Sequence, residues 1–204
     1  MRSLKWLWQQ IDRALKTFAE SLGTTPDILA NNAGVNLPRR YLHQLTPENI
    51  RMMLDGNLTA PFMTSVAVLP GMKAKGGGLL IQIASMAGKR VSFLSGPSYI
   101  AAKHGLVGLT RTAALEGGEH GITVNAVCPA YVRTPLVDHQ IADQAAANRL
   151  SPEEVVEKIM LAPAAVKRLI EPAEVADFVA YLCSEPAGVI TGAALTMDLG
   201  WTAR

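Results

Sequence analysis

Short apolar runs that alternate with longer helical patterns constrain the fold of this 204-residue chain more than any other feature. Turn residues bound the runs, as they bound strands that are buried on both faces of a parallel sheet. The intervals are long enough for crossover helices. The pattern therefore predicts one α/β domain over residues 1–204, with a mostly parallel sheet and helices on both faces. The expected strands are 27–30, 79–84, 122–128 and 193–198.

Apolar spacing of three and four residues predicts the helices. Thr46-Pro47-Glu48 is typical of a helix start, and the helix that follows contains Gly56-Asn57 and Pro61. We expect Pro61 to kink this helix. Further helices are expected at 4–22, 98–116, 135–147, 152–161 and 172–184, with 133–167 forming a helical substrate loop. The 4–22 helix has two alternative roles, packing on the sheet or binding a membrane surface or partner.

Composition excludes several classes of protein. The net charge is +2 and no basic run occurs, so nucleic acid is not an expected partner. The two cysteines, Cys128 and Cys183, fit neither a disulfide framework nor a metal site, and we expect both to be buried. No stretch is apolar enough to span a membrane, and the N-terminus lacks a signal-peptide core. The chain is therefore expected to be cytoplasmic, with no metal and no membrane partner.

Tyr99 and Lys103 stand four residues apart in an expected helix, and this spacing places them on one face. An ammonium beside a phenol stabilises the phenolate and lowers the phenol's pKa, which makes Tyr99 a candidate general acid/base. An amphipathic surface pair has the same spacing, so the surrounding residues decide between the two. Small residues at 31–34 and Ser85 both follow expected strands, where open α/β sheets bind ligands.

These motifs occur in a particular order along the chain. The order is Asn31-Asn32-Ala33-Gly34, Asn57, Ser85, Tyr99, Lys103, then residues 125–129 and 132–135. In this order the chain resembles the short-chain dehydrogenase/reductase family over nearly its whole length. The resemblance implies a three-layer Rossmann-type fold and an oxidoreductase. Such an enzyme moves a hydride between a nicotinamide cofactor, NAD or NADP, and a small secondary alcohol or ketone.

The resemblance also implies roles for individual residues. Tyr99 is the acid/base on the substrate oxygen, and Lys103 lowers its pKa and holds the cofactor ribose. Ser85 donates a hydrogen bond to that oxygen, and Asn57 holds a water that links Lys103 to solvent. For Ser85 the alternative is a turn hydroxyl, and for Asn57 a capped or kinked helix without chemistry. The implied cofactor-binding residues are Asn31, Ala33, Gly34, Ile83, Tyr99, Lys103, Pro129, Val132 and Thr134.

Residues 132–141, 151–155 and 198–201 resemble the bacterial D-3-hydroxybutyrate dehydrogenases within that family. This implies 3-hydroxybutyrate and acetoacetate as substrates and NAD as cofactor. It also implies that Gln140 and Trp201 contact the substrate beside Ser85 and Tyr99, although Trp201 is equally consistent with packing. The carboxylate-binding glutamine, histidine and lysine of those enzymes are replaced here by Asn36, Ala87 and Gly96. Lys89 and Arg90 are the candidates to take the place of the missing cation.

The glycine-rich turn that opens such domains and holds the pyrophosphate has no counterpart here, since the first glycines are Gly23 and Gly34. The comparison implies an N-terminally truncated domain in which the 27–30 strand is an exposed edge. The alternative function is a non-catalytic remnant or a binding subunit that pairs through this edge. Ser85, Tyr99, Lys103 and Asn57 together favour the oxidoreductase. The family resemblance further implies a homo-oligomer, a dimer or tetramer.

Overall fold

The structure is a computed structural model that describes residues 13–14, 17, 23–38, 41–91 and 94–203. The helix expected at 4–22 lies outside the described residues except for Arg13, Ala14 and Thr17.

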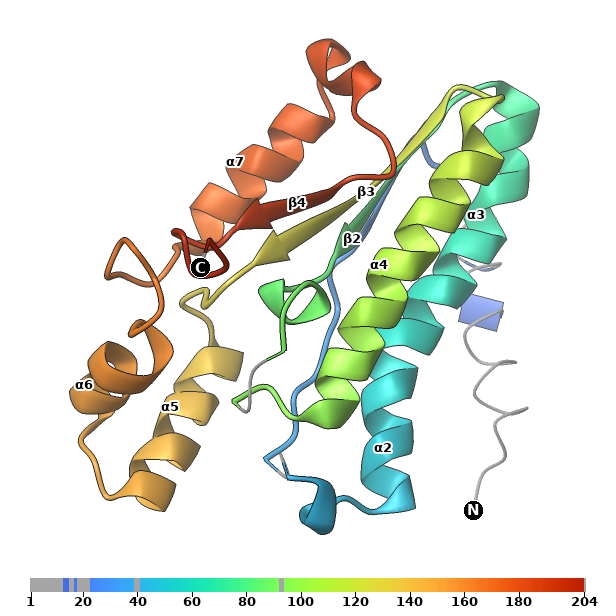
Figure 1. Ribbon diagram of the computed structural model, residues 1–204. Coiled ribbons are helices and arrows are strands. Elements are labelled where there is room, and N and C mark those ends of the chain that lie inside the picture. The colour runs from blue at the N-terminus through green and yellow to red at the C-terminus, as the bar shows by residue number, and fades with distance from the viewer. Residues whose placement is uncertain (1–12, 15–16, 18–22, 39–40, 92–93, 204) are drawn as a thin grey trace.

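In the described part of the chain, four parallel strands form the centre of the fold, in the order β1-β2-β3-β4 (Figure 1). They are β1 (Ile28–Asn31), β2 (Gly78–Ile83), β3 (Ile122–Pro129) and β4 (Ala194–Met197). All four strand predictions are confirmed to within one or two residues. Asn31 pairs with Gln82, and Ile83 pairs with Val127, so the strands end at the same edge of the sheet. Parallel pairing thus brings the residues that follow β1, β2 and β3 together.

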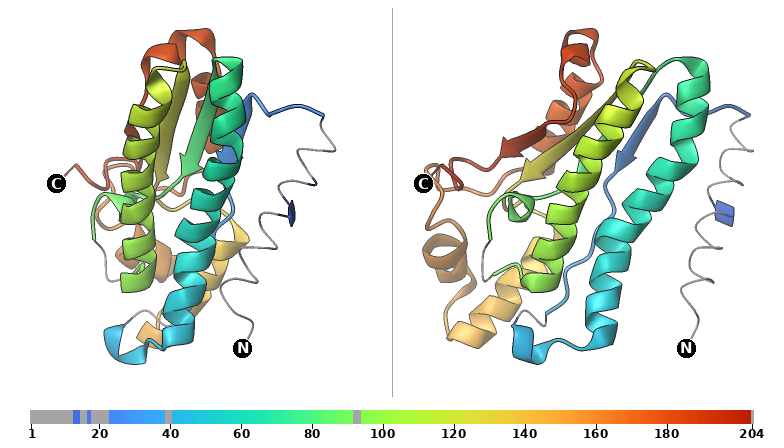
Figure 2. Two further views of the ribbon diagram at one scale, coloured as in Figure 1. Left: turned by 90° about the vertical axis from the view of Figure 1, so that its right-hand side faces the viewer. Right: turned by 45° about the vertical axis from the view of Figure 1, so that its right-hand side comes forward.

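Helices cover both faces of this sheet (Figures 1 and 2). On one face, α3 (Ala60–Lys75) and α4 (Pro97–Gly118) pack Met72 and Ala113 against Leu80 and Val124. On the other face, α7 (Pro172–Leu182) packs Leu182 in a cluster with the strand residues Leu79, Ile81 and Val127. The predicted three-layer α/β architecture with a parallel sheet is therefore confirmed.

The helix expected to start after Thr46 is interrupted, but not in the predicted way. Its first part is α2 (Pro47–Leu54), capped by Thr46 Oγ1, which accepts from the Asn49 amide at 3.2 Å. A π-helical turn, η2 (Asp55–Thr59), comes next, and α3 then begins at Ala60. The expected kink at Pro61 is thus replaced by a π turn just before it. Pro61 occupies the first turn of α3, where its missing N–H is tolerated.

The excursion after β3 is helical, and Figure 1 shows it beyond the carboxyl ends of the strands. It contains α5 (Pro135–Asn148), α6 (Pro152–Val155) and the π turn η4 (Val156–Met160). Ser151 and Glu154 form a capping box at the start of α6. Short 3₁₀ turns occur at η1 (Leu42–Gln44), η3 (Met86–Gly88) and η5 (Glu185–Val189). None of the helices formed by the described residues has both the length and the apolar character that crossing a bilayer requires.

β1 is an edge strand within the described part of the chain, because it pairs with β2 alone there. Ile28 keeps 47% of its surface exposed, and the strand is only partly buried. The parallel pairing predicted for this segment is confirmed. Its side chains are exposed to the degree expected of an edge strand, not of a strand buried on both faces.

We predict that Gly88→Ala destabilises the chain by about 2 kcal/mol. A Cβ at residue 88 would lie 2.6 Å from the backbone oxygen of Lys103, so η3 or α4 would have to move. Gly108→Ala is the matched control, because a Cβ there meets open space on α4 and alanine favours a helix by up to about 1 kcal/mol. Urea unfolding measures both variants. Equal stability of Gly88→Ala and the parent chain would contradict this packing.

Candidate active site

A cavity of about 570 Å³ opens at the carboxyl ends of β1, β2 and β3. The turn after β1, the last residues of β2 and β3, the start of α4 and one side of α7 all contribute to its walls. The predicted site residues that line it are Gly34, Asn57, Ile83, Ser85, Tyr99, Lys103, Pro129, Val132 and Thr134. Segments far apart in the sequence therefore converge here, and they include all four residues expected to be catalytic.

Asn57 lies in the π turn and is completely buried. Its side-chain Oδ1 accepts from the Val35 amide at 3.1 Å, and Nδ2 donates to the carbonyl oxygens of Val35 at 2.8 Å and Met53 at 2.9 Å. The Asn57 amide therefore holds the loop after β1 against the π turn. Pro61 has no N–H, so the Asn57 carbonyl lacks the donor that a regular α-helix would supply four residues later.

Gly34 lies between two of the expected catalytic residues. A Cβ on this glycine would stand 3.0 Å from Asn57 Oδ1 and 3.8 Å from Lys103 Nζ. The turn after β1 thus fits closely against both side chains, and the absence of a side chain at residue 34 permits that fit.

Tyr99 lies in the first turn of α4 and is partly buried, on the same side of the cavity as Ser85. Burial raises the pKa of the Tyr99 phenol, while hydrogen bonding by the Ser85 side chain lowers that pKa by less. Without a ligand, the pKa of Tyr99 is therefore raised, whereas the sequence predicted that Lys103 would lower it. Lys103 Nζ lies 5.6 Å from the centre of the Tyr99 ring, over its face. Ser85 Oγ accepts from the Ala87 amide at 3.1 Å, which fixes Ser85 as the N-cap of η3.

Lys103 keeps only 3% of its surface exposed. Its ammonium donates to the Ile83 carbonyl oxygen at the end of β2, at 2.8 Å. Burial lowers the pKa of Lys103 to about 8, and the charge of Cys128 opposes that shift. An ammonium has three donors, so two remain for a ligand in the cavity.

Asn31 and Ala33 do not line the cavity, although both were predicted to bind the cofactor. Asn31 instead belongs to a polar network beneath the sheet edge. Its Nδ2 donates to Gln82 Oε1 at 2.9 Å, and its Oδ1 accepts from Thr64 Oγ1 at 2.7 Å. Alternation along β1 explains this, because the side chain of Asn31 points to α3 while its neighbours Ala30 and Asn32 line the cavity.

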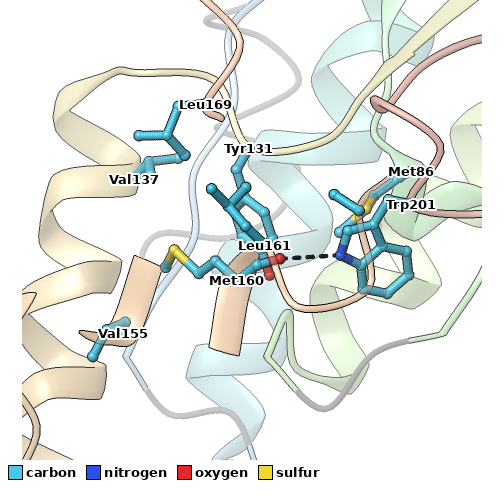
Figure 3. Close-up of a cluster of buried hydrophobic side chains, with 9 residues drawn as sticks. Met86, Tyr131, Val137, Val155, Met160, Leu161, Leu169 and Trp201 are labelled. Carbon is cyan, nitrogen blue, oxygen red and sulfur yellow. Dashed lines mark hydrogen bonds between the residues drawn. The ribbon is translucent and has the colours of Figure 1, made fainter. Parts of the chain in front are cut away.

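Gln140 and Trp201, the expected substrate contacts, do not line the cavity either. Gln140 is 7% exposed on α5. Trp201 packs in an apolar cluster with Met86 and Tyr131, and its indole Nε1 donates to the Met160 carbonyl at 3.2 Å (Figure 3). Trp201 is therefore positioned as a packing residue, which was the alternative to its predicted contact with the substrate.

The two cations near the replaced carboxylate-binding positions are turned to other parts of the fold. Lys89 Nζ donates to the Ala194 carbonyl oxygen at 3.1 Å and to the Thr196 hydroxyl on β4. The Arg90 guanidinium lies 5.9 Å from the centre of the Trp201 ring. Among the described lining residues, Lys103 is the one cation.

Sequence reasoning missed the contribution of α7. Pro172, Val175, Ala176 and Val179 line the cavity, and Leu136 and Val137 of α5 add further apolar surface. The apolar spacing of α7 predicted a helix that packs on the sheet, and its overhang beyond the strand ends leaves no signal in the sequence. Cys183 was expected to be buried but is exposed, whereas Cys128 is buried. The described residues form no cluster of three or more side chains suited to a metal ion.

Comparison with known proteins gives consistent relatives. Residues 8–202 match the family model described as Enoyl-(Acyl carrier protein) reductase. D-beta-hydroxybutyrate dehydrogenase of Rhizobium meliloti is 43% identical over 178 residues, which are 87% of this chain and 68% of that protein. Acetoacetyl-CoA reductase of the same organism is 37% identical over 85% of this chain and 67% of that protein. Cyclohexanol dehydrogenase of Acinetobacter is 35% identical over 94% of this chain and 70% of that protein.

We predict that, between pH 8 and 10, the free energy of unfolding of the parent chain increases with pH relative to that of the Lys103→Met variant. The folded pKa of Lys103 is about 8 and the ordinary value is 10.5, so the unfolded chain binds more protons in this interval. The gain should reach about 2 kcal/mol and be absent below pH 8. Urea unfolding of both chains across this range measures it. A difference that does not change with pH would contradict the buried ammonium.

Proposed function

The chain belongs to the short-chain dehydrogenase/reductase family of NAD(P)-dependent oxidoreductases, and from this we propose how it acts on a small secondary alcohol or ketone. The observation that carries the proposal is the convergence of Ser85, Tyr99, Lys103 and Asn57 on one cavity. A nicotinamide cofactor, when bound, accepts a hydride from the alcohol carbon or returns it to the ketone carbon. The residues of the chain handle the proton and the charge on the oxygen.

In the reducing direction, Tyr99 donates the phenol proton to the ketone oxygen as that oxygen gains negative charge. Ser85 donates a hydrogen bond to the same oxygen and so stabilises the developing charge. The raised pKa of Tyr99 in the chain alone keeps the phenol protonated for this step. In the oxidising direction the same proton returns from the alcohol to Tyr99.

Lys103 and Asn57 supply the proton's route to solvent in this proposal. Lys103 lies 5.6 Å from the centre of the Tyr99 ring and has donors that its bond to Ile83 leaves unused. The carbonyl of Asn57 lacks its α-helical donor because residue 61 is proline, so it can accept from a water. The Asn57 side chain does not take part, since its amide is engaged with Val35 and Met53.

The cavity fits the nicotinamide and ribose end of a dinucleotide. Lys103 offers donors to ribose hydroxyls, and Gly34 leaves space beside it that a Cβ would fill. Ile83, Pro129, Val132 and Thr134 form walls of largely apolar character, as an aromatic ring requires. We propose NAD as the cofactor, as the resemblance to the hydroxybutyrate dehydrogenases implies, and NADPH serves as the comparison ligand.

Relatives named for hydroxybutyrate and for cyclohexanol mark two substrate choices. A carboxylate needs a cation or several hydrogen-bond donors to hold it in a cavity. In the described lining the one cation is Lys103, which faces Ile83 and Tyr99, while Lys89 is bonded to β4. Leu136 and Val137 add apolar surface. This lining favours a neutral alcohol or ketone over 3-hydroxybutyrate and acetoacetate.

A non-catalytic remnant or an edge-pairing binding subunit is not favoured, because the curated relatives are dehydrogenases and reductases and the four residues converge. We also propose that the chain forms a homo-oligomer. Apolar side chains are exposed on two helices, Phe62 and Val66 on α3 and Leu115 on α4. Their exposure supports a contact between copies of the chain through these helices.

We predict that Tyr99→Phe lowers kcat for ketone reduction by about a hundredfold to ten-thousandfold, because the substrate oxygen loses its proton donor. Binding of NADH or NADPH, read by energy transfer from tryptophan to the nicotinamide, should be retained. Tyr181→Phe is the matched control, since Tyr181 is an exposed tyrosine of α7 that does not line the cavity. A Tyr99→Phe chain with parental kcat would refute the proposed acid.

We predict that cyclohexanone is reduced with a higher kcat/KM than acetoacetate, since the described lining holds one cation and that cation is engaged near Tyr99. Initial rates with both ketones, at saturating NADH, measure the ratio. A higher kcat/KM for acetoacetate would mean that the chain binds the carboxylate, and the hydroxybutyrate assignment would then stand.

A further inference from the structure

Two walls of the cavity are joined on the side away from it. Val132 and Thr134 line the cavity, but Arg133 between them directs its side chain outward. Arg133 Nε donates to Glu171 Oε1 at 3.0 Å. Glu171 is the N-cap of α7, whose first residue, Pro172, also lines the cavity. One ion pair therefore connects the segment that leaves β3 with the start of α7.

Backbone contacts lie beside this ion pair. The Ile170 amide donates to the Tyr131 carbonyl at 2.9 Å, and the Arg133 amide donates to the Ile170 carbonyl at 2.9 Å. Val132 and Ile170 form an isolated parallel bridge. The start and the end of the helical excursion thus meet at one point, with the ion pair at its outer side.

A second ion pair fixes the α7 side of this junction. The Arg168 guanidinium donates to both carboxylate oxygens of Glu174, each at 2.6 Å. Glu174 Oε2 also accepts from the Glu171 amide at 2.8 Å, so it holds the N-cap in place. Among the described residues, Glu171 is the one ion-pair partner of the Arg133 side chain.

We infer that Arg133 and Glu171 are positioning residues for the dinucleotide, an inference that rests on the proposed function. Their ion pair adds to the backbone bonds that hold the Val132–Thr134 segment beside the residues before α7, and so stabilises the orientation of both segments at the cavity. Neither side chain lines the cavity, so the pair acts on the cofactor through its neighbours.

The exposure of this pair separates a positioning role from a purely structural one. The side chains of Arg133 and Glu171 are 59% and 51% exposed, and ion pairs this exposed contribute little to global stability. Small displacements of a binding wall nevertheless weaken the contacts that the wall makes. Loss of the pair should therefore change cofactor affinity without changing the unfolding transition.

The test is a titration of the purified chain with NADH, with Arg133→Met and Arg133→Lys as variants. Arg133→Met should weaken NADH binding about threefold to tenfold, and Arg133→Lys should recover part of the loss. Lys158→Met is the matched control, because it removes the similarly exposed Lys158–Glu154 pair, 58% and 40% exposed, away from the cavity. It should leave binding unchanged, and all variants should unfold at the parental midpoint.

Glu171→Gln completes a double-mutant cycle and keeps a side-chain oxygen at the N-cap. If the pair acts as a unit, Glu171→Gln and Arg133→Met together should weaken binding no more than either alone. Parental NADH affinity in Arg133→Met, or an equal loss in Lys158→Met, would overturn the positioning role. A parent chain that binds neither NADH nor NADPH would instead overturn the proposed function, and this inference with it.

Discussion

The buried amide of Asn57 is the interaction on which the rest of the site depends. It is completely buried and makes three hydrogen bonds, two of them to Val35 and one to Met53. Leaving such a group without partners costs about 1–3 kcal/mol for each lost bond, so the loop after β1 is strongly held. That loop carries Gly34, which stands between Asn57 and Lys103. One amide therefore ties the loop after the sheet edge to the π turn, and Gly34 in that loop fits beside Lys103 of α4.

The same interaction explains why a poor helix sequence persists between Asp55 and Pro61. Glycine, asparagine and proline all disfavour a helix interior, and the chain forms a π turn here instead of a kink at the proline. The wider turn brings the Asn57 side chain to Val35, and proline at residue 61 removes the N–H that the Asn57 carbonyl would accept in a regular α-helix. Local propensity and site geometry conflict here, as is expected where function outweighs stability.

The sequence predicted those features that depend on local pattern. Periodicity identified the strands and most helices, and the parallel sheet then required Gly34, Ser85 and Pro129 to meet at one edge. Features that depend on packing at a distance were not predictable in this way. Three features follow from how the layers stack. These are the overhang of α7, the direction of the Asn31 side chain toward Gln82, and the burial of Trp201 against Met160. The net pKa direction of Tyr99 was missed for the same reason, since burial raises the pKa by more than the Ser85 hydrogen bond lowers it.

Lys103 connects the energetics of folding with the chemistry of the site. Burial brings its pKa down to about 8, and among the described residues the one acceptor of its ammonium is the Ile83 carbonyl. The ammonium is therefore only partly compensated, and a buried charge of this kind costs stability. Ribose hydroxyls that accept from Lys103 would favour its charged form and raise its pKa. Cofactor binding and protonation of Lys103 would then support one another, and the charge next to Tyr99 would be strongest when the ligand is in place. The folded chain thus carries a cost at Lys103 that a bound dinucleotide would offset, and the stability of α4 would then depend on occupation of the cavity.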